Sequence, residues 1–165
     1  MTSEKALNII YAAVKERYNF EIDRIRHLDN KANNVMSIAG ILATLVSGLA
    51  SLSVTASVNA LDILVLAAFV TCLCLLFESF YLGLRAYQIR SYTIVPDPPI
   101  LIGEGEKMEA SKIAQTLCDN YALATEENMG KNEEKVSYTK VATWLVLGSL
   151  VSFAVFAFFT ILGRN

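Results

Sequence analysis

The chain has 165 residues, of which 54% are hydrophobic and only 18% are charged, and its formal net charge is −2. This excess of apolar residues is unusual for a soluble domain, because so much apolar surface has to be buried somewhere. The slightly acidic balance provides no overall basic field, so we do not expect nucleic acid as a partner.

Residues 1–31 are predicted to form an amphipathic helix on the cytoplasmic side of a membrane. Apolar residues recur there in steps of three or four, which places them on one helical stripe: Leu7, Tyr11, Val14, Tyr18, Ile22, Ile25 and Leu28. A cleaved signal peptide would have its apolar core close behind a short basic start, whereas about thirty helix-prone residues come first here. We therefore expect one continuous helix from Ser3 to Val54.

Three stretches are long enough to cross a bilayer, which takes about 20 apolar residues in a helix. The segment 32–54 is the predicted first transmembrane helix, with its core at Val35–Val54, and it carries no charge after Lys31. A short external loop, 55–62, leads to the second transmembrane helix, 63–84, in which Glu78 is the only charged residue. The third, 141–163, follows a long cytoplasmic segment.

That cytoplasmic segment, 85–140, is predicted to contain a loop and then a helix. The stretch Ser91–Glu106 holds three prolines and two glycines, which mark a loop. Helical spacing of apolar residues follows from Ile113 onward, and we expect Gly130 and Asn132 to bend or fray the helix. We predict that it packs antiparallel to the N-terminal helix, as a helical hairpin or stalk. Such a pair exposes more apolar surface than it buries, which favours a homo-oligomer.

The distribution of lysine and arginine predicts the orientation. Of 14 such residues, six lie at or before the start of the first span, seven lie between the second and third spans, and Arg164 alone follows the third. The positive-inside rule makes the lysine-rich and arginine-rich side cytoplasmic. We therefore predict a multi-pass protein of the plasma membrane with a cytoplasmic N-terminus and an external C-terminus.

The membrane segments contain two features of interest. Gly40, Thr44 and Gly48 are four residues apart, and small residues at this spacing favour close packing on another helix, within or between subunits. Glu78 is costly in hydrocarbon, so we expect it near the inner boundary, at the depth of Lys31. It is interpreted either as a carboxylate that fixes helix register or as part of a carboxylate ring lining an ion path.

Polar residues gather where the cytoplasmic helices meet the membrane. As a hypothesis, they form a layer that couples movement of the cytoplasmic helices to packing of the membrane helices. The alternative is that these residues only fix the orientation of the helices in the membrane. The layer consists of Asp29, Lys31, Asn33, Asn34, Glu78 and Arg85. No glycine-rich phosphate loop, nucleophile elbow or metal-binding motif occurs, so we expect no enzyme, no metal and no cofactor.

The stretch "LDNKANNVMSIAGILATLVSGL" resembles the start of the first span in the Pycsar effector family, membrane proteins of bacterial and archaeal antiphage defence. An Asp-x-Lys-Ala-Asn sequence marks this point in the family, and Asp29, Lys31, Ala32 and Asn33 match it in order. The layout is also similar: paired spans, a proline-bearing loop, a polar helix and a last span.

The resemblance implies a membrane effector. A partner cyclase makes a cyclic nucleotide on infection, the effector responds, and membrane integrity fails. Many relatives carry an additional nucleotide-sensing domain, and none is recognisable here. The cyclic nucleotide could instead bind between cytoplasmic helices of neighbouring subunits through the phosphate-binding candidates Arg17, Arg24 and Arg26. These arginines equally suit ion pairs with acidic neighbours or contacts with the headgroups of the lipid bilayer.

Two other functions remain open from the sequence. A small ion channel subunit would use Glu78 in its conduction path. Three spans without an inverted repeat give little support to this function. A non-enzymatic membrane scaffold would use its helical stalk to recruit a partner.

Overall fold

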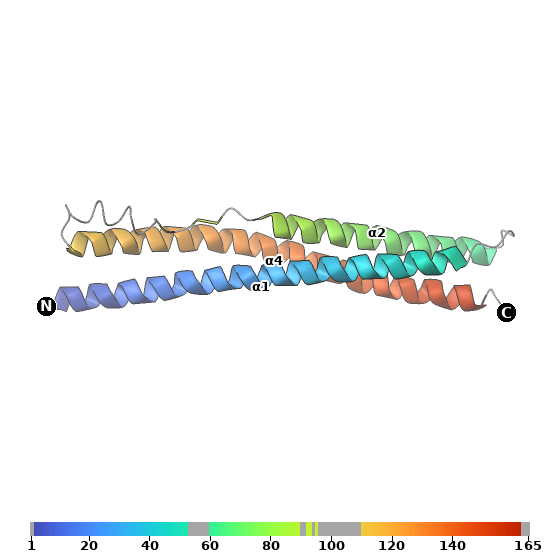
Figure 1. Cartoon of the computed structure of the whole chain (residues 1–165), viewed down its shortest axis with the longest axis horizontal. Coiled ribbons are helices and arrows are strands. Elements are labelled where there is room, and N and C mark those ends of the chain that lie inside the picture. The colour runs from blue at the N-terminus through green and yellow to red at the C-terminus, as the bar shows by residue number, and fades with distance from the viewer. Residues whose placement is uncertain (1, 53–59, 90–91, 94, 96–109, 163–165) are drawn as a thin grey trace. The chain divides into compact units, whose positions relative to one another are not determined.

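The computed structural model describes residues 2–52, 60–89, 92, 93, 95 and 110–162, and the secondary structure in these ranges is entirely helical. The helices are α1 (Thr2–Leu52), α2 (Ala60–Gln88) and α4 (Ala110–Leu162) (Figure 1). All three are long and apolar enough to cross a membrane. The prediction of an all-helical protein with three candidate transmembrane helices is therefore confirmed. Much of the predicted external loop 55–62 and most of the loop 91–106 lie outside the described residues.

Both long helices are continuous. The predicted helix from Ser3 is present as far as Leu52, while Val54 lies outside the described residues. The fraying predicted at Gly130 and Asn132 is wrong, because α4 is helical through both positions. Asn132 is fully buried and donates a hydrogen bond to the Glu21 carboxylate, so tertiary packing outweighs the weak helix propensity of this stretch.

The chain divides into two compact units. Unit 1 comprises Met1–Leu28 and Ile89–Glu134, and unit 2 comprises Asp29–Gln88 and Lys135–Asn165. Helices α1 and α4 each contribute residues to both units.

In unit 1, α1 and α4 run parallel. Tyr11 and Tyr18 pack against Tyr121, and Glu21, further along α1, binds Asn132, further along α4. The predicted antiparallel hairpin is thus wrong. The physical reason is the order of the helices along the chain. In unit 2, α2 is antiparallel to both α1 and α4, so α1 and α4 run in the same direction (Figure 1).

Buried and half-buried residues on α1 and α4 follow alternating steps of three and four, the repeat of a coiled-coil seam. On α1 the seam includes Tyr11, Val14, Tyr18, Glu21, Ile25, Leu28, Ala32, Val35, Ala39, Leu42 and Val46. On α4 it includes Cys118, Tyr121, Thr125, Asn128, Asn132, Lys135, Thr139, Ala142, Val146, Ser149, Phe153 and Phe156. The predicted apolar stripe holds except at one turn, where Glu21 is buried and Ile22 is only half-buried; the side chain of Leu7 lies outside the described residues.

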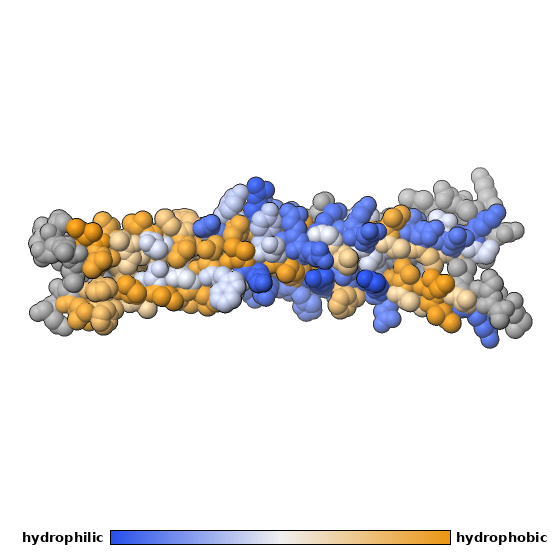
Figure 2. Space-filling view, turned by 180° about the vertical axis from the view of Figure 1, so that it is seen from behind, coloured by the Kyte–Doolittle hydropathy of each residue, from blue (hydrophilic) through white to orange (hydrophobic). Residues whose placement is uncertain are grey.

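Unit 2 is a three-helix bundle with a small apolar core. The core contains Val35, Ala39, Val46, Cys72, Leu76, Ala142 and Val146. Ser79 of α2 donates a hydrogen bond to the Ala142 carbonyl at 2.8 Å. Large apolar side chains cover most of the outer surface of this unit, as Figure 2 shows for one face, and this is the surface expected of helices that face lipid.

The close approach of α1 and α2 depends on Gly83. A Cβ atom at this position would lie 2.7 Å from Cγ of Met36 and 3.6 Å from the carbonyl oxygen of Ala32. The absence of a side chain at Gly83 therefore lets the two backbones pack at small separation.

Candidate functional site

An ion pair in unit 2 joins α1 to α4. Lys135 Nζ lies 2.5 Å from Asp29 Oδ1, and the Lys135 side chain is fully buried while that of Asp29 is 31% exposed. Lys135 faces inward because it occupies a position on the seam of α4. A buried ammonium group requires a partner, so this contact is important for the packing of the two helices.

Hydroxyl groups near the ion pair are satisfied by backbone carbonyls. Thr139, one turn beyond Lys135, donates to the Lys135 carbonyl at 2.8 Å, and Thr143 donates to the Thr139 carbonyl at 2.8 Å. Ala32, one turn beyond Asp29, is fully buried beside Gly83. The polar pair therefore lies about one helical turn from the close approach of α1 and α2.

The proposed coupling layer is only partly assembled. Of its six residues, Asp29 makes a polar side-chain contact with Lys135 of α4. Lys31, Asn33 and Asn34 are exposed, and Arg85 donates to the hydroxyl of Tyr81 on its own helix at 3.0 Å. The coupling hypothesis itself is untested and stays a prediction.

The sequence predicted Glu78 at the depth of Lys31, and this prediction is wrong. Its neighbours on α2, Leu76, Phe77 and Phe80, line a shallow apolar groove with Ala39, Gly40 and Ala43 of α1. Glu78 therefore lies about two helical turns further along α1 than Lys31. Its side chain is exposed, and no hydrogen bond or ion pair joins it to another described residue.

Sequence reasoning missed Lys135 as a site residue. It lies in the charged run "NEEK", which by composition resembles a solvated helix face. The signal that could have identified it is its spacing, because Lys135 is three residues after Asn132 and four before Thr139, both of which face the seam.

Unit 1 contains a second buried polar pair. The Glu21 side chain accepts a hydrogen bond from Asn132 Nδ2 at 2.8 Å and one from Arg24 at 3.4 Å, and Glu21 is only 4% exposed. The Oδ1 atom of Asn132 is buried and has no hydrogen-bond partner within the described part of the chain. Glu21 and Asn132 therefore form an incompletely satisfied polar contact in the seam.

Tyr121 is the centre of an aromatic cluster in unit 1. Its ring lies 5.2 Å from that of Tyr18 and 5.9 Å from that of Tyr11, and both pairs meet edge to face. Burial raises the pKa of Tyr121, and the neighbouring Tyr11 and Tyr18 raise it further. The cluster therefore favours a neutral, hydrogen-bonding phenol at this position.

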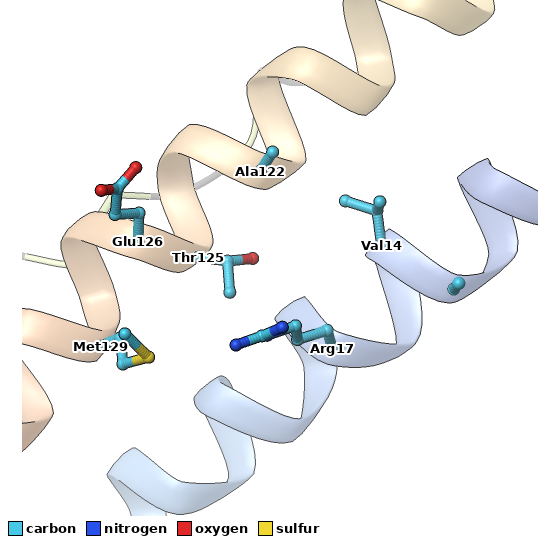
Figure 3. A pocket seen from close by; sticks show the side chains of 7 residues that line it. Val14, Arg17, Ala122, Thr125, Glu126 and Met129 are labelled. Atoms are coloured by element: carbon cyan, nitrogen blue, oxygen red, sulfur yellow. The ribbon is translucent and has the colours of Figure 1, made fainter.

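The three candidate phosphate-binding arginines differ in their surroundings. Arg24 pairs with Glu21 at 3.4 Å and Arg26 pairs with Asp23 at 3.3 Å, each with an acid three residues earlier. Arg17 has no ion pair or hydrogen bond to any described side chain. It lines a groove of about 500 Å³ in unit 1, together with Ala13, Val14, Ala122, Thr125, Glu126 and Met129 (Figure 3).

The predicted packing face of α1 lies at the surface of the part of the chain that the structure describes. Gly40, Thr44 and Gly48 are exposed, and a Cβ atom added at either glycine would meet no heavy atom of another helix within 4 Å. The Thr44 hydroxyl donates to the Gly40 carbonyl at 3.0 Å. Packing between subunits, the second alternative from the sequence, remains a prediction.

The same face of α1 is unusually polar for a surface in the candidate membrane region. Small or polar residues follow one another in steps of four and three along it: Asn33, Ser37, Gly40, Thr44 and Ser47, all exposed. By contrast, the exposed residues of α2 and α4 in unit 2 include large apolar side chains such as Phe77, Trp144 and Phe158.

Comparison of the chain with protein-family models, with curated proteins and with solved structures gave no match. No group of three histidine, cysteine, aspartate or glutamate residues within the described ranges is arranged to hold a metal ion.

Proposed function

We propose that this membrane protein is an effector of antiphage, abortive-infection defence. A cyclic nucleotide from a partner cyclase triggers it, and as an oligomer it impairs membrane integrity. The support is the resemblance at Asp29, Lys31, Ala32 and Asn33, together with three helices that are long and apolar enough to cross a membrane. The observation that carries the proposal is the buried contact of Asp29 with Lys135.

This contact gives the motif a physical role. Asp29 binds α4, and Ala32, one turn later, is buried where α2 approaches α1. Lys31 and Asn33 point outward. The motif therefore has two inward positions that join three helices and two outward positions that are available to lipid or to another subunit.

A buried ion pair is suited to a switch. Replacing such a pair by apolar residues is often neutral or stabilising, whereas removing one partner is costly, so its presence here favours a role in specificity. In the proposed resting state, Lys135 holds α1 and α4 together in unit 2. The trigger shifts the population toward a state in which this pair is broken, and it can do so only by binding that state more tightly.

The polar face of α1 supports the oligomeric part of the proposal. Hydroxyl and amide side chains in hydrocarbon favour partners on neighbouring helices, and Gly40 permits a close approach. In the proposed active state, these faces of several copies meet one another and replace contacts with lipid.

Dye release from liposomes that contain the purified protein tests the proposal. Release is expected with one member of a panel of cyclic purine and pyrimidine mononucleotides. The variant Asp29→Ala, which leaves the buried ammonium group of Lys135 without this partner, is expected to release dye without nucleotide. Asp23→Ala, at an exposed position of the same helix, is the matched control and should behave as wild type. If no nucleotide of the panel causes dye release although the protein is correctly inserted, the result would contradict the proposal and favour a scaffold.

A further inference from the structure

The groove in unit 1 is open on one side of the α1 and α4 pair. Elsewhere on α4, the chain's own residue Thr93 covers the surface: its backbone N–H donates to Asn128 Oδ1 at 2.9 Å, and its carbonyl accepts from Asn128 Nδ2 at 3.0 Å. The Thr93 hydroxyl also contacts Glu127. No described segment of the chain covers the groove itself, which has Arg17 on one wall and Glu126 on the other.

A second stripe runs along α1 on the groove side. Ile10, Ala13, Arg17 and Phe20 follow one another in steps of three, four and three, which is the spacing of the seam itself. The Ile10 and Phe20 side chains are 52% and 66% exposed. Figure 2 shows an apolar patch over the N-terminal part of α1, where Ile9 and Ile10 are exposed. A helix with a second, largely apolar stripe is typical of a bundle with more than two helices.

We propose that a second copy of this chain covers the groove, with unit 1 of each copy packed on the other about a two-fold axis that runs along the helix pair. The result is a four-helix bundle in which α1 of one copy lies beside α4 of the other. This inference goes beyond the proposed function and does not depend on any nucleotide.

The opposite charges of Arg17 and Glu126, on the two walls of the groove, favour a second copy of the chain as its occupant. Arg17 and Glu126 line one groove, so they lie at the same level along the helix pair. Rotation about an axis parallel to the pair preserves that level and brings Arg17 of each copy to the second copy's Glu126. A two-fold contact is self-complementary, so one such interface contains two opposite-charge pairs.

Within one copy these two charges do not satisfy each other. Arg17 extends from α1 toward Thr125 and Met129, while the Glu126 side chain points away from it (Figure 3). Neither side chain has an ion pair or hydrogen bond to another side chain in the ranges that the structure describes. Both are exposed and remain accessible to a second copy.

Charge reversal in the full chain tests this interface. Arg17→Glu and Glu126→Arg, each alone, place like charges opposite one another, and each is expected to weaken self-association about tenfold or more. The double variant Arg17→Glu with Glu126→Arg recreates the pairs in reverse and should restore the wild-type value. Arg26→Glu and Glu134→Arg make the same charge changes at exposed positions outside the groove and serve as controls. The readout is the oligomeric state in one detergent, by light scattering over a dilution series.

Single variants that associate like the controls, or a double variant that is no better than the singles, would overturn the interface. So would an Arg17→Glu variant that keeps its oligomeric state but loses nucleotide-triggered dye release, because that result would assign Arg17 to a ligand. A failure of nucleotide response with the charge-swap pattern intact would instead contradict only the proposed function.

A cysteine cross-link provides a second measurement that does not depend on charge. One copy carries Ala13→Cys and a differently tagged copy carries Ala122→Cys, both at groove positions. Co-expressed copies should form a disulfide between the two tags under mild oxidation. Copies with only one of the two substitutions, paired with wild type, control for the native cysteines. A mixed-tag product no more abundant than in these controls would overturn the arrangement.

Discussion

Lys135 on α4 and Asp29 on α1 form an ion pair of unequal burial, with Nζ 2.5 Å from Oδ1 and the lysine fully buried beside a partly exposed aspartate. This inequality predicts that the two residues respond differently to substitution. Loss of the aspartate leaves a charge in the interior, whereas loss of the lysine leaves a carboxylate that water can reach.

We therefore expect Asp29→Ala to lower the free energy of unfolding by about 3–5 kcal/mol and Lys135→Met to change it by no more than about 1 kcal/mol. Thermal unfolding followed by circular dichroism in a single detergent measures both. Asp23→Ala, which breaks an exposed pair with Arg26, is the control and should cost about 1 kcal/mol or less. Equal losses for Asp29→Ala and Lys135→Met would contradict this account of the pair.

The contact of Glu21 with Asn132 gives a second prediction. Asn132→Leu removes the 2.8 Å hydrogen bond to a buried carboxylate and should destabilise the protein by about 1–3 kcal/mol. The double variant with Glu21→Leu removes both polar groups from the seam and should recover that loss or exceed wild-type stability. A double-mutant cycle of thermal unfolding measures the coupling.

An additive cycle at Glu21 and Asn132 would show that the two side chains do not interact. The same variants should also be examined for their oligomeric state, because buried polar residues in a seam can determine register as well as stability.

The sequence was sufficient to predict the helices and the candidate spans, because long apolar runs and a regular apolar stripe are properties of residue type and spacing alone. It was insufficient for Glu21 and Lys135, because charged residues are normally exposed and only the seam reveals that these two face inward. The depth of Glu78 was also misjudged, since the register of α2 on α1 depends on the close packing at Gly83 and Met36.

Gly83 provides a test of that register. A methyl group there would lie 2.7 Å from Met36 Cγ, so Gly83→Ala is expected to cost about 1–3 kcal/mol through overpacking. Met36→Ala in the same chain removes the clashing atoms and should recover part of the loss. Gly40→Ala is the matched control, because a Cβ atom there meets no heavy atom within 4 Å and alanine has the higher helix propensity. Equal effects of the Gly83 and Gly40 substitutions on thermal unfolding would contradict the observed register.

The pKa of Tyr121 gives a prediction of pH dependence. Because burial and the neighbouring tyrosines raise this pKa above its ordinary value of about 10, the folded state favours the neutral phenol. Its contribution to stability is therefore complete below about pH 10 and is lost as the pH rises through the raised folded-state value. Unfolding midpoints measured across this alkaline range should fall for wild type and fall less for Tyr121→Phe, which keeps the ring and cannot ionise. Tyr138→Phe, outside the cluster, controls for the general effect of losing one tyrosine. If the unfolding midpoints of wild type and Tyr121→Phe depend on pH in the same way, the prediction is contradicted.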